Sequence, residues 1–149
     1  MTTSRMTIRR MSMGLAFFAS FSLFACSLPK IHPNVTILPP YDTNRQVIES
    51  VNRHCEAWEA DFHRKTDPIE IEVMTGTFQC GLVDSIGCTD GRRIKVTAHY
   101  SSAQYGLPAL YHELCHRNRV SEAFWNDNTH QDDRWEMWTQ RGYDLAGVE

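Results

Sequence analysis

The stretch "HELCH", residues 112–116, places two histidines four positions apart with a glutamate directly after the first. Residues four apart on a helix lie on one face, so His112 and His116 can direct ring nitrogens at a single metal ion. Zinc accepts two such nitrogens together with a third protein ligand and a water molecule. Glu113 lies about 100° further around the helix axis, where it can act as the general base towards that water. The spacing therefore predicts a zinc hydrolase.

The spacing leaves the third zinc ligand open. The extended pattern HExxHxxGxxH would need a glycine and a histidine where this chain has Arg119 and Glu122, which disfavours that class. His130 lies 14 residues after His116, in a polar stretch, and Glu136 lies 20 residues after it. The spacing of Glu136 resembles that of thermolysin-like enzymes, and zinc accepts either imidazole or carboxylate.

The segment "HELCH" with the downstream "HQDDRWEMWTQRGYD" resembles the SprT-like zinc metallopeptidases over about residues 107–145. The resemblance implies a zinc ion held by the two histidines of the motif and by His130. Glu136 would then hydrogen-bond a ligand histidine. The chain departs from the family at Thr129 and Gln131, where the family has glycines, and in its export signal, since family members are typically not exported.

Hydrolysis of an amide also needs a group that stabilises the negative oxygen of the tetrahedral intermediate. The candidates are Tyr143 and Arg141, downstream of the motif, together with Tyr111 and His99, and the sequence does not rank the four. In zincins the strand before the motif helix offers its edge to an extended substrate. By that resemblance, residues 93–100 are expected to bind the substrate.

The first 25 residues have the pattern of a signal peptide. A basic start with Arg5, Arg9 and Arg10 precedes an apolar run over residues 13–25, which is too short to span a bilayer. The run ends in "LFAC", which resembles the lipobox of bacterial lipoproteins and implies lipidation of Cys26. With serine rather than aspartate after it, the predicted location is the outer membrane facing the periplasm; the alternative is a plain secretory signal.

Charge and cysteines fit an exported protein that does not bind nucleic acid. The chain has 15 Lys+Arg and 18 Asp+Glu, so removing the three arginines of the signal leaves 12 against 18, a net charge of −6. A surface of that charge is a poor partner for phosphates. The four cysteines after Cys26 allow two disulfides in an oxidising compartment. We favour Cys80–Cys88, which closes a glycine-containing loop, and Cys55–Cys115, which would join two helices.

The elements that must position the motif follow from periodicity. Residues 26–41 contain four prolines and are expected to form an extended tether. Apolar residues at helical spacing predict a long helix over 43–64, with Thr43 and Gln46 as a capping box. Alternation predicts strands over 69–78 and 93–100, and helical spacing returns in the motif helix, from about Leu107, and in a C-terminal helix over 134–145. The predicted domain, residues 42–149, is a small α+β, zincin-like fold in which the long helix backs the motif helix beside a short mixed sheet.

The sequence thus predicts a lipid-anchored, extracytoplasmic zinc metallopeptidase that cleaves peptide or protein substrates, with Glu113 as its base. Two alternatives share these features. One is a non-catalytic envelope lipoprotein, whose metal serves stability or whose domain binds a partner; the glutamate of the motif argues against it, since a structural site needs no base. The other is a zinc amidase that acts on cell-wall peptides.

Overall fold

A computed structural model describes residues 27–101, 104–118 and 133–148 of the chain. The predicted signal peptide (residues 1–25), Cys26 and His130 lie outside these ranges. The helices are α1 (Arg45–Phe62), α2 (Leu110–Arg117) and α3 (Asp133–Ala146). The strands are β1 (Val35–Ile37), β2 (Ile69–Met74), β3 (Phe78–Cys80), β4 (Val83–Ser85), β5 (Gly87–Thr89), β6 (Arg93–Thr97), β7 (His99–Ser101) and β8 (Gln104–Gly106). No helix within the described ranges is long and apolar enough to cross a membrane.

Four strands form a mixed sheet in the order β1-β2-β6-β5, while β3–β4 and β7–β8 are separate hairpins. β1, β2 and β6 run parallel, with Ile71 of β2 opposite Ile37 of β1 and Ile94 of β6. β5 runs antiparallel to β6 and forms one edge of the sheet. The predicted α+β class with a mixed sheet is confirmed. The expectation that residues 93–100 form the free edge is wrong, because β6 pairs on both sides.

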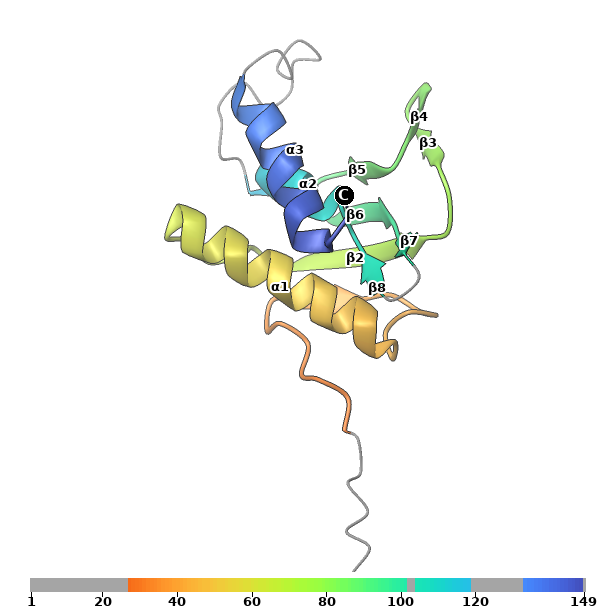
Figure 1. The fold of residues 1–149 in the computed structure, drawn as a ribbon, viewed down its shortest axis with the longest axis vertical. Helices are drawn as coiled ribbons and strands as arrows, with labels where there is room; N and C mark the ends of the chain where they lie inside the picture. Colours follow the sequence, from red (N-terminus) through yellow and green to blue (C-terminus); the bar gives the residue numbers. More distant parts are fainter. Residues whose placement is uncertain (1–26, 102–103, 119–132, 149) are drawn as a thin grey trace, which may run out of the picture.

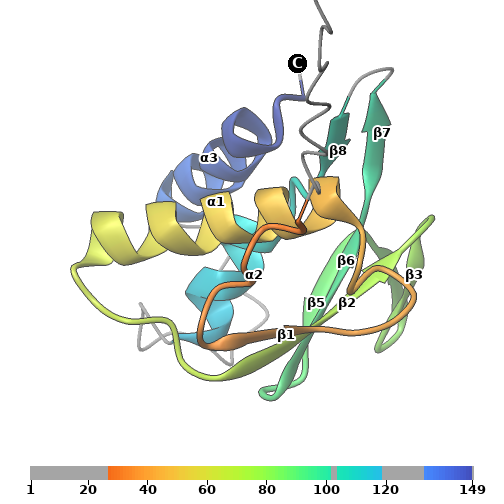
Figure 2. The same cartoon turned by 90° about the horizontal axis from the view of Figure 1, so that it is seen from below.

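The two faces of the sheet differ as the alternating sequence predicts. Ile69, Ile71 and Val73 of β2 are buried, whereas Glu70 and Glu72 point to the other face. There both glutamates accept hydrogen bonds from the Arg93 guanidinium, at 3.1 and 3.3 Å. Figures 1 and 2 show the three helices on the same side of the sheet. The apolar face of the sheet is therefore covered by helices, and its charged face is open to solvent.

The long helix is present, and it is capped by Asn44 rather than by the predicted Thr43. The Asn44 side chain accepts a hydrogen bond from the backbone N–H of Val47 at 3.1 Å, which satisfies a donor of the first turn. The helix stops at His63, which adopts the left-handed conformation with φ 51°. The buried face of α1 consists of Val47, Ile48, Ser50, Val51, His54, Cys55 and Trp58.

Residues 27–41 are part of the fold, not the predicted tether. Val35–Ile37 form β1 in the sheet, and His32 is buried with its Nε2 3.4 Å from Glu59. The guanidinium of Arg45 donates to the Ser27 carbonyl at 2.8 Å. The prolines suggested a tether because they interrupt any regular pattern. Their spacing still leaves three consecutive residues, "VTI", free to pair with β2.

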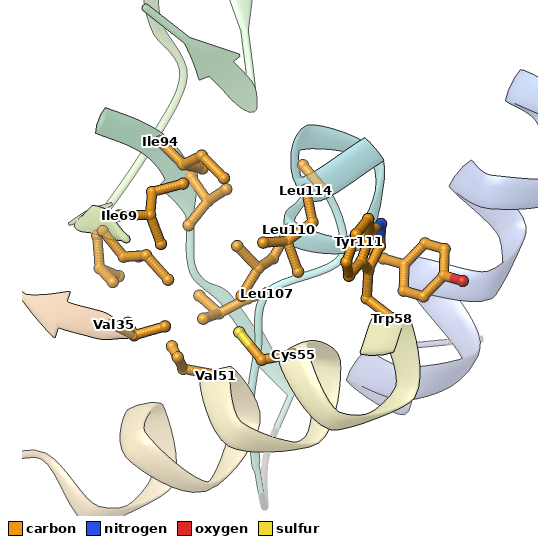
Figure 3. Packing of buried hydrophobic residues seen from close by; sticks show 14 of the residues in the cluster. Val35, Val51, Cys55, Trp58, Ile69, Ile94, Leu107, Leu110, Tyr111 and Leu114 are labelled. Atoms are coloured by element: carbon orange, nitrogen blue, oxygen red, sulfur yellow. The ribbon is translucent and has the colours of Figure 1, made fainter. Parts of the chain in front are cut away.

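The motif helix α2 is short and packs against four other elements. It contacts α1, α3 and strands β5 and β6. Leu110, Tyr111 and Leu114 of α2 are almost completely buried, and Figure 3 shows Leu110 and Leu114 directed towards Leu107 and the sheet, with Tyr111 beside Trp58 of α1. The predicted long backing helix is therefore confirmed as the support of α2.

One of the two predicted disulfides is present. Cys80 of β3 is bonded to Cys88 of β5, which ties the β3–β4 hairpin to the edge strand. Cys55 and Cys115 are both free and buried, so the predicted Cys55–Cys115 bridge is wrong. Cys55 points between Val51 and Leu107 (Figure 3), whereas Cys115 lies beside the indole of Trp58, one turn further along α1. The two sulfur atoms therefore have neighbours on different turns of α1.

The pairing can be tested by counting thiols without a reducing agent, in protein with Cys26 replaced by serine. We expect a maleimide to label no cysteine in the native protein, because Cys55 and Cys115 are buried, and two after unfolding in guanidinium chloride. Mass spectrometry of the intact, labelled protein gives the count. An unfolded protein that takes up no label would show instead that all four cysteines are bridged.

Candidate metal centre

The two histidines of the motif converge, as their spacing predicts. On α2 the Nε2 atoms of His112 and His116 lie 2.9 Å apart, and their ring centroids are separated by 4.7 Å. Both side chains are half-buried, so their outer sides are open to solvent. Two zinc–nitrogen bonds of about 2.0–2.1 Å in tetrahedral geometry place the nitrogens about 3.3 Å apart. The observed pair is within a few tenths of an ångström of that separation, so these residues fit a zinc ion.

Glu113 is buried between α2 and the edge strand, with 7% of its surface exposed. A Cβ atom at Gly87 of β5 would lie 2.7 Å from the Oε1 of Glu113 and 2.7 Å from the Cβ of Ala109. Only glycine therefore lets β5 approach the glutamate so closely. Burial alone raises the pKa of Glu113 to about 8, since the charged form loses its hydration.

α3 covers the imidazoles with an aromatic ring. The Trp135 ring stacks on His116, with centroids 4.2 Å apart and planes inclined by 23°, and it lies 4.9 Å from the ring of His112. Trp135 is itself almost completely buried. These contacts restrict the rotation of both imidazoles.

Thr139, one turn after Trp135 on α3, is a site residue that the sequence analysis missed. Its Oγ1 atom lies 2.9 Å from the Nδ1 atom of His112. A single threonine on a C-terminal helix carries no local signal of such a contact. Only the helical phase relative to Trp135 could have suggested it, once α3 was known to pack on α2.

Of the two candidates for the third ligand, His130 and Glu136, only Glu136 lies within the described residues. Glu136 is exposed on the first turn of α3. Across residues 27–101, 104–118 and 133–148, no group of three His, Cys, Asp or Glu side chains is arranged to hold a metal ion. The described residues thus bring together two ring nitrogens, those of His112 and His116.

The suggested oxyanion stabilisers occupy different positions. The Tyr111 hydroxyl donates to the Asp61 carboxylate of α1 at 2.7 Å, and the Nε of Arg141 donates to the same oxygen at 3.4 Å. Both side chains thus join their helices to α1. Tyr143 is half-buried on α3, one turn after Thr139, and His99 is exposed in β7. Of these candidates, Tyr143 therefore lies on the same face of α3 as Thr139.

Cys115 lies within the motif but faces the core. Burial raises the pKa of its thiol well above the usual range; a hydrogen bond with Trp58 lowers it by less than burial raises it, and the charges of Asp61 and Glu113 add smaller increases. The thiol is therefore protonated at neutral pH and is a poor metal ligand, since metals bind the thiolate.

Comparison with known proteins identifies no relative. No protein-family model matches the chain, and neither a curated protein nor a solved structure does.

The burial of Glu113 predicts a pH dependence of stability in the metal-free protein. Folding raises its pKa from 4.5 to about 8. The contribution of Glu113 to the free energy of unfolding is therefore fully present below pH 4.5 and is lost as the pH rises to 8. Each pKa unit corresponds to about 1.4 kcal/mol. We expect Glu113→Gln to become progressively more stable than the wild type across that range, measured by urea unfolding with a chelator present.

The matched control is Glu56→Gln, which removes an exposed carboxylate from α1. Its stability difference from the wild type should stay nearly constant over the same pH range. Parallel curves for the wild type and Glu113→Gln would contradict the burial of a titrating carboxyl at this position.

Proposed function

We propose that this protein is a zinc-dependent peptidase in which Glu113 is the general base. The observation that carries the proposal is the convergence of the Nε2 atoms of His112 and His116, 2.9 Å apart, beside a buried carboxyl on the same helix. A site that served stability alone would have no use for that carboxyl. Among the described residues no charged group pairs with it, and burying a carboxyl without such a partner costs free energy, which a role in catalysis explains.

Zinc would be held by His112 and His116, with His130 as the proposed third ligand and Glu136 as the alternative. When bound, zinc acidifies a water molecule and polarises the carbonyl of the scissile bond. The donor set fits this metal, because neutral imidazole is a preferred zinc ligand and two protein nitrogens already face one another.

Glu113 accepts a proton from the attacking water and later delivers it to the leaving amine nitrogen. In the metal-free protein burial raises its pKa to about 8, and the positive charge of a bound zinc ion would lower that pKa and so favour the ionised, basic form of the carboxyl. The walls formed by Ala109 and Gly87 keep the carboxyl away from bulk water. Tyr143 is the proposed side chain for the oxyanion.

The substrate we propose is an extended polypeptide that pairs with the edge of β5. The Ile86 carbonyl accepts from Thr97 of β6 at 2.8 Å, so the backbone groups of the next residue, Gly87, point away from β6. In the structure the Ser85 hydroxyl contacts both the N–H and the carbonyl of Gly87. An incoming strand would replace these contacts and place its backbone beside Glu113.

We also propose a zincin-like fold and a cell-envelope location for this domain. A short buried helix with an HExxH motif beside an antiparallel edge strand supports a zincin-like domain related to the SprT-like peptidases. The basic and apolar N-terminal sequence, with "LFAC" before residue 27, supports a lipoprotein at the outer membrane that faces the periplasm.

Catalysis can be tested with Glu113→Gln, which keeps the shape of the side chain and removes the base. We expect kcat on an unfolded protein substrate to fall by about 10²–10⁴-fold, while zinc remains bound. The assay measures release of fluorescent peptides from labelled casein.

A second arm with cell-wall peptides distinguishes an amidase from a general peptidase. A wild type that binds zinc but cleaves neither substrate would favour a non-catalytic lipoprotein.

The third ligand can be tested by zinc stoichiometry on two variants. His130→Ala should lower bound zinc well below one ion per chain, because a two-nitrogen site binds weakly. Glu136→Ala should retain the full ion. Metal analysis after dialysis measures both. If Glu136→Ala loses zinc while His130→Ala keeps it, the third ligand is Glu136.

A further inference from the structure

The hydroxyl of Thr139 makes two contacts that can both be hydrogen bonds only if the Nδ1 of His112 carries a proton. Its Oγ1 donates to the Trp135 carbonyl, one turn earlier on α3, at 2.8 Å, and it lies 2.9 Å from the Nδ1 of His112. A hydroxyl has one hydrogen, and a carbonyl can only accept. With that hydrogen directed to Trp135, the oxygen has only lone pairs to offer His112. Nδ1 must therefore carry a proton for the second contact to be a hydrogen bond.

A neutral imidazole carries one proton, so protonation at Nδ1 leaves Nε2 unprotonated. In His112 this is the atom that lies 2.9 Å from the Nε2 of His116. Metal binding needs an unprotonated nitrogen directed at the ion, and the hydrogen bond at the other nitrogen determines which tautomer is present. We propose that Thr139 is a positioning residue that holds His112 in the metal-binding tautomer. This inference rests on the proposed zinc centre.

The placement of Thr139 is set by close packing of α3 against α2 and α1. At Gly142, three residues further on, a Cβ atom would lie 2.1 Å from the Pro108 carbonyl oxygen, so only glycine allows this approach. The Gly142 carbonyl lies 3.3 Å from the Nε2 of His54, a fully buried residue of α1. Backbone contacts on either side of α3 thus fix the distance between the hydroxyl and His112.

The stacked Trp135 ring also restrains the His112 imidazole. It lies against both imidazoles, and its carbonyl receives the Thr139 hydrogen. One turn of α3 therefore sets both the plane of the His112 ring and the position of its proton. Removing the hydroxyl would leave the stacked ring in place and take away the acceptor that favours a proton at Nδ1.

The test compares Thr139→Val, which keeps the shape without the hydroxyl, with Thr139→Ser, which keeps the hydroxyl. Thr77→Val is the matched control, because Thr77 is exposed in the β2–β3 connection. All are produced as the full chain and purified in detergent as the cell processes them. In metal-free protein, ¹⁵N-detected NMR of labelled histidine reports the tautomer of His112. Competition with a chromophoric chelator then gives the zinc affinity.

We expect His112 to be protonated at Nδ1 in the wild type, Thr139→Ser and Thr77→Val, and to show mixed tautomers in Thr139→Val. Zinc affinity should fall by about 10–100-fold in Thr139→Val and change only a few-fold in the other two. If Thr139→Val does not fold, judged by circular dichroism, Thr139→Ala serves as the variant without a hydroxyl.

The outcomes separate this inference from the proposed function. Unchanged tautomer and unchanged zinc affinity in Thr139→Val would overturn the role of Thr139 and leave the metal centre standing. A wild type that binds no zinc would overturn the metal centre, while the tautomer of metal-free His112 would still decide whether Thr139 fixes its proton. Protonation at Nε2 in the wild type would also overturn the inference.

Discussion

A helix of eight residues cannot form stably in water, because too few hydrogen bonds offset the cost of starting it. α2 is such a helix, and it holds both histidines and Glu113. Its stability comes from tertiary burial, since Leu110 and Leu114 are completely enclosed between α1 and the sheet. One face of the helix makes this core, and the remaining face carries the polar chemistry. The long helix α1 and the strands β5 and β6 can be understood as the support that this packing needs.

The second constraint is that the site is built from two helices that are distant in sequence. α2 supplies the imidazoles, and α3 supplies the ring and the hydroxyl that restrict them. At Gly142, α3 approaches the backbone of Pro108, just before α2, so closely that a single methyl group would prevent the contact. A metal site needs ligands held within a few tenths of an ångström, and a rigid junction of this kind provides that precision more readily than loops do.

Local periodicity predicted the elements well, because hydrophobic spacing is a property of neighbours in sequence. The long helix, the strand at residues 69–74, the motif helix and the C-terminal helix are all present near the expected positions. The errors concern contacts between distant segments. Cys55 and Cys115 lie on helices that do pack together, yet a disulfide depends on the turn that each faces. The identity of the edge strand depends on the order of strands in space, and the contact of Thr139 with His112 depends on the packing of α3.

The ordered start of the domain limits how far it can move from an anchor. Ser27 is hydrogen-bonded to Arg45, and the Lys30 carbonyl accepts from Asn52 of the same helix. If Cys26 carries the lipid, only one peptide unit, about 3.8 Å between Cα atoms, separates the acylated residue from the folded body. The domain would then rest on the bilayer in a restricted orientation, and the polypeptides within its reach would be those held close to the membrane surface.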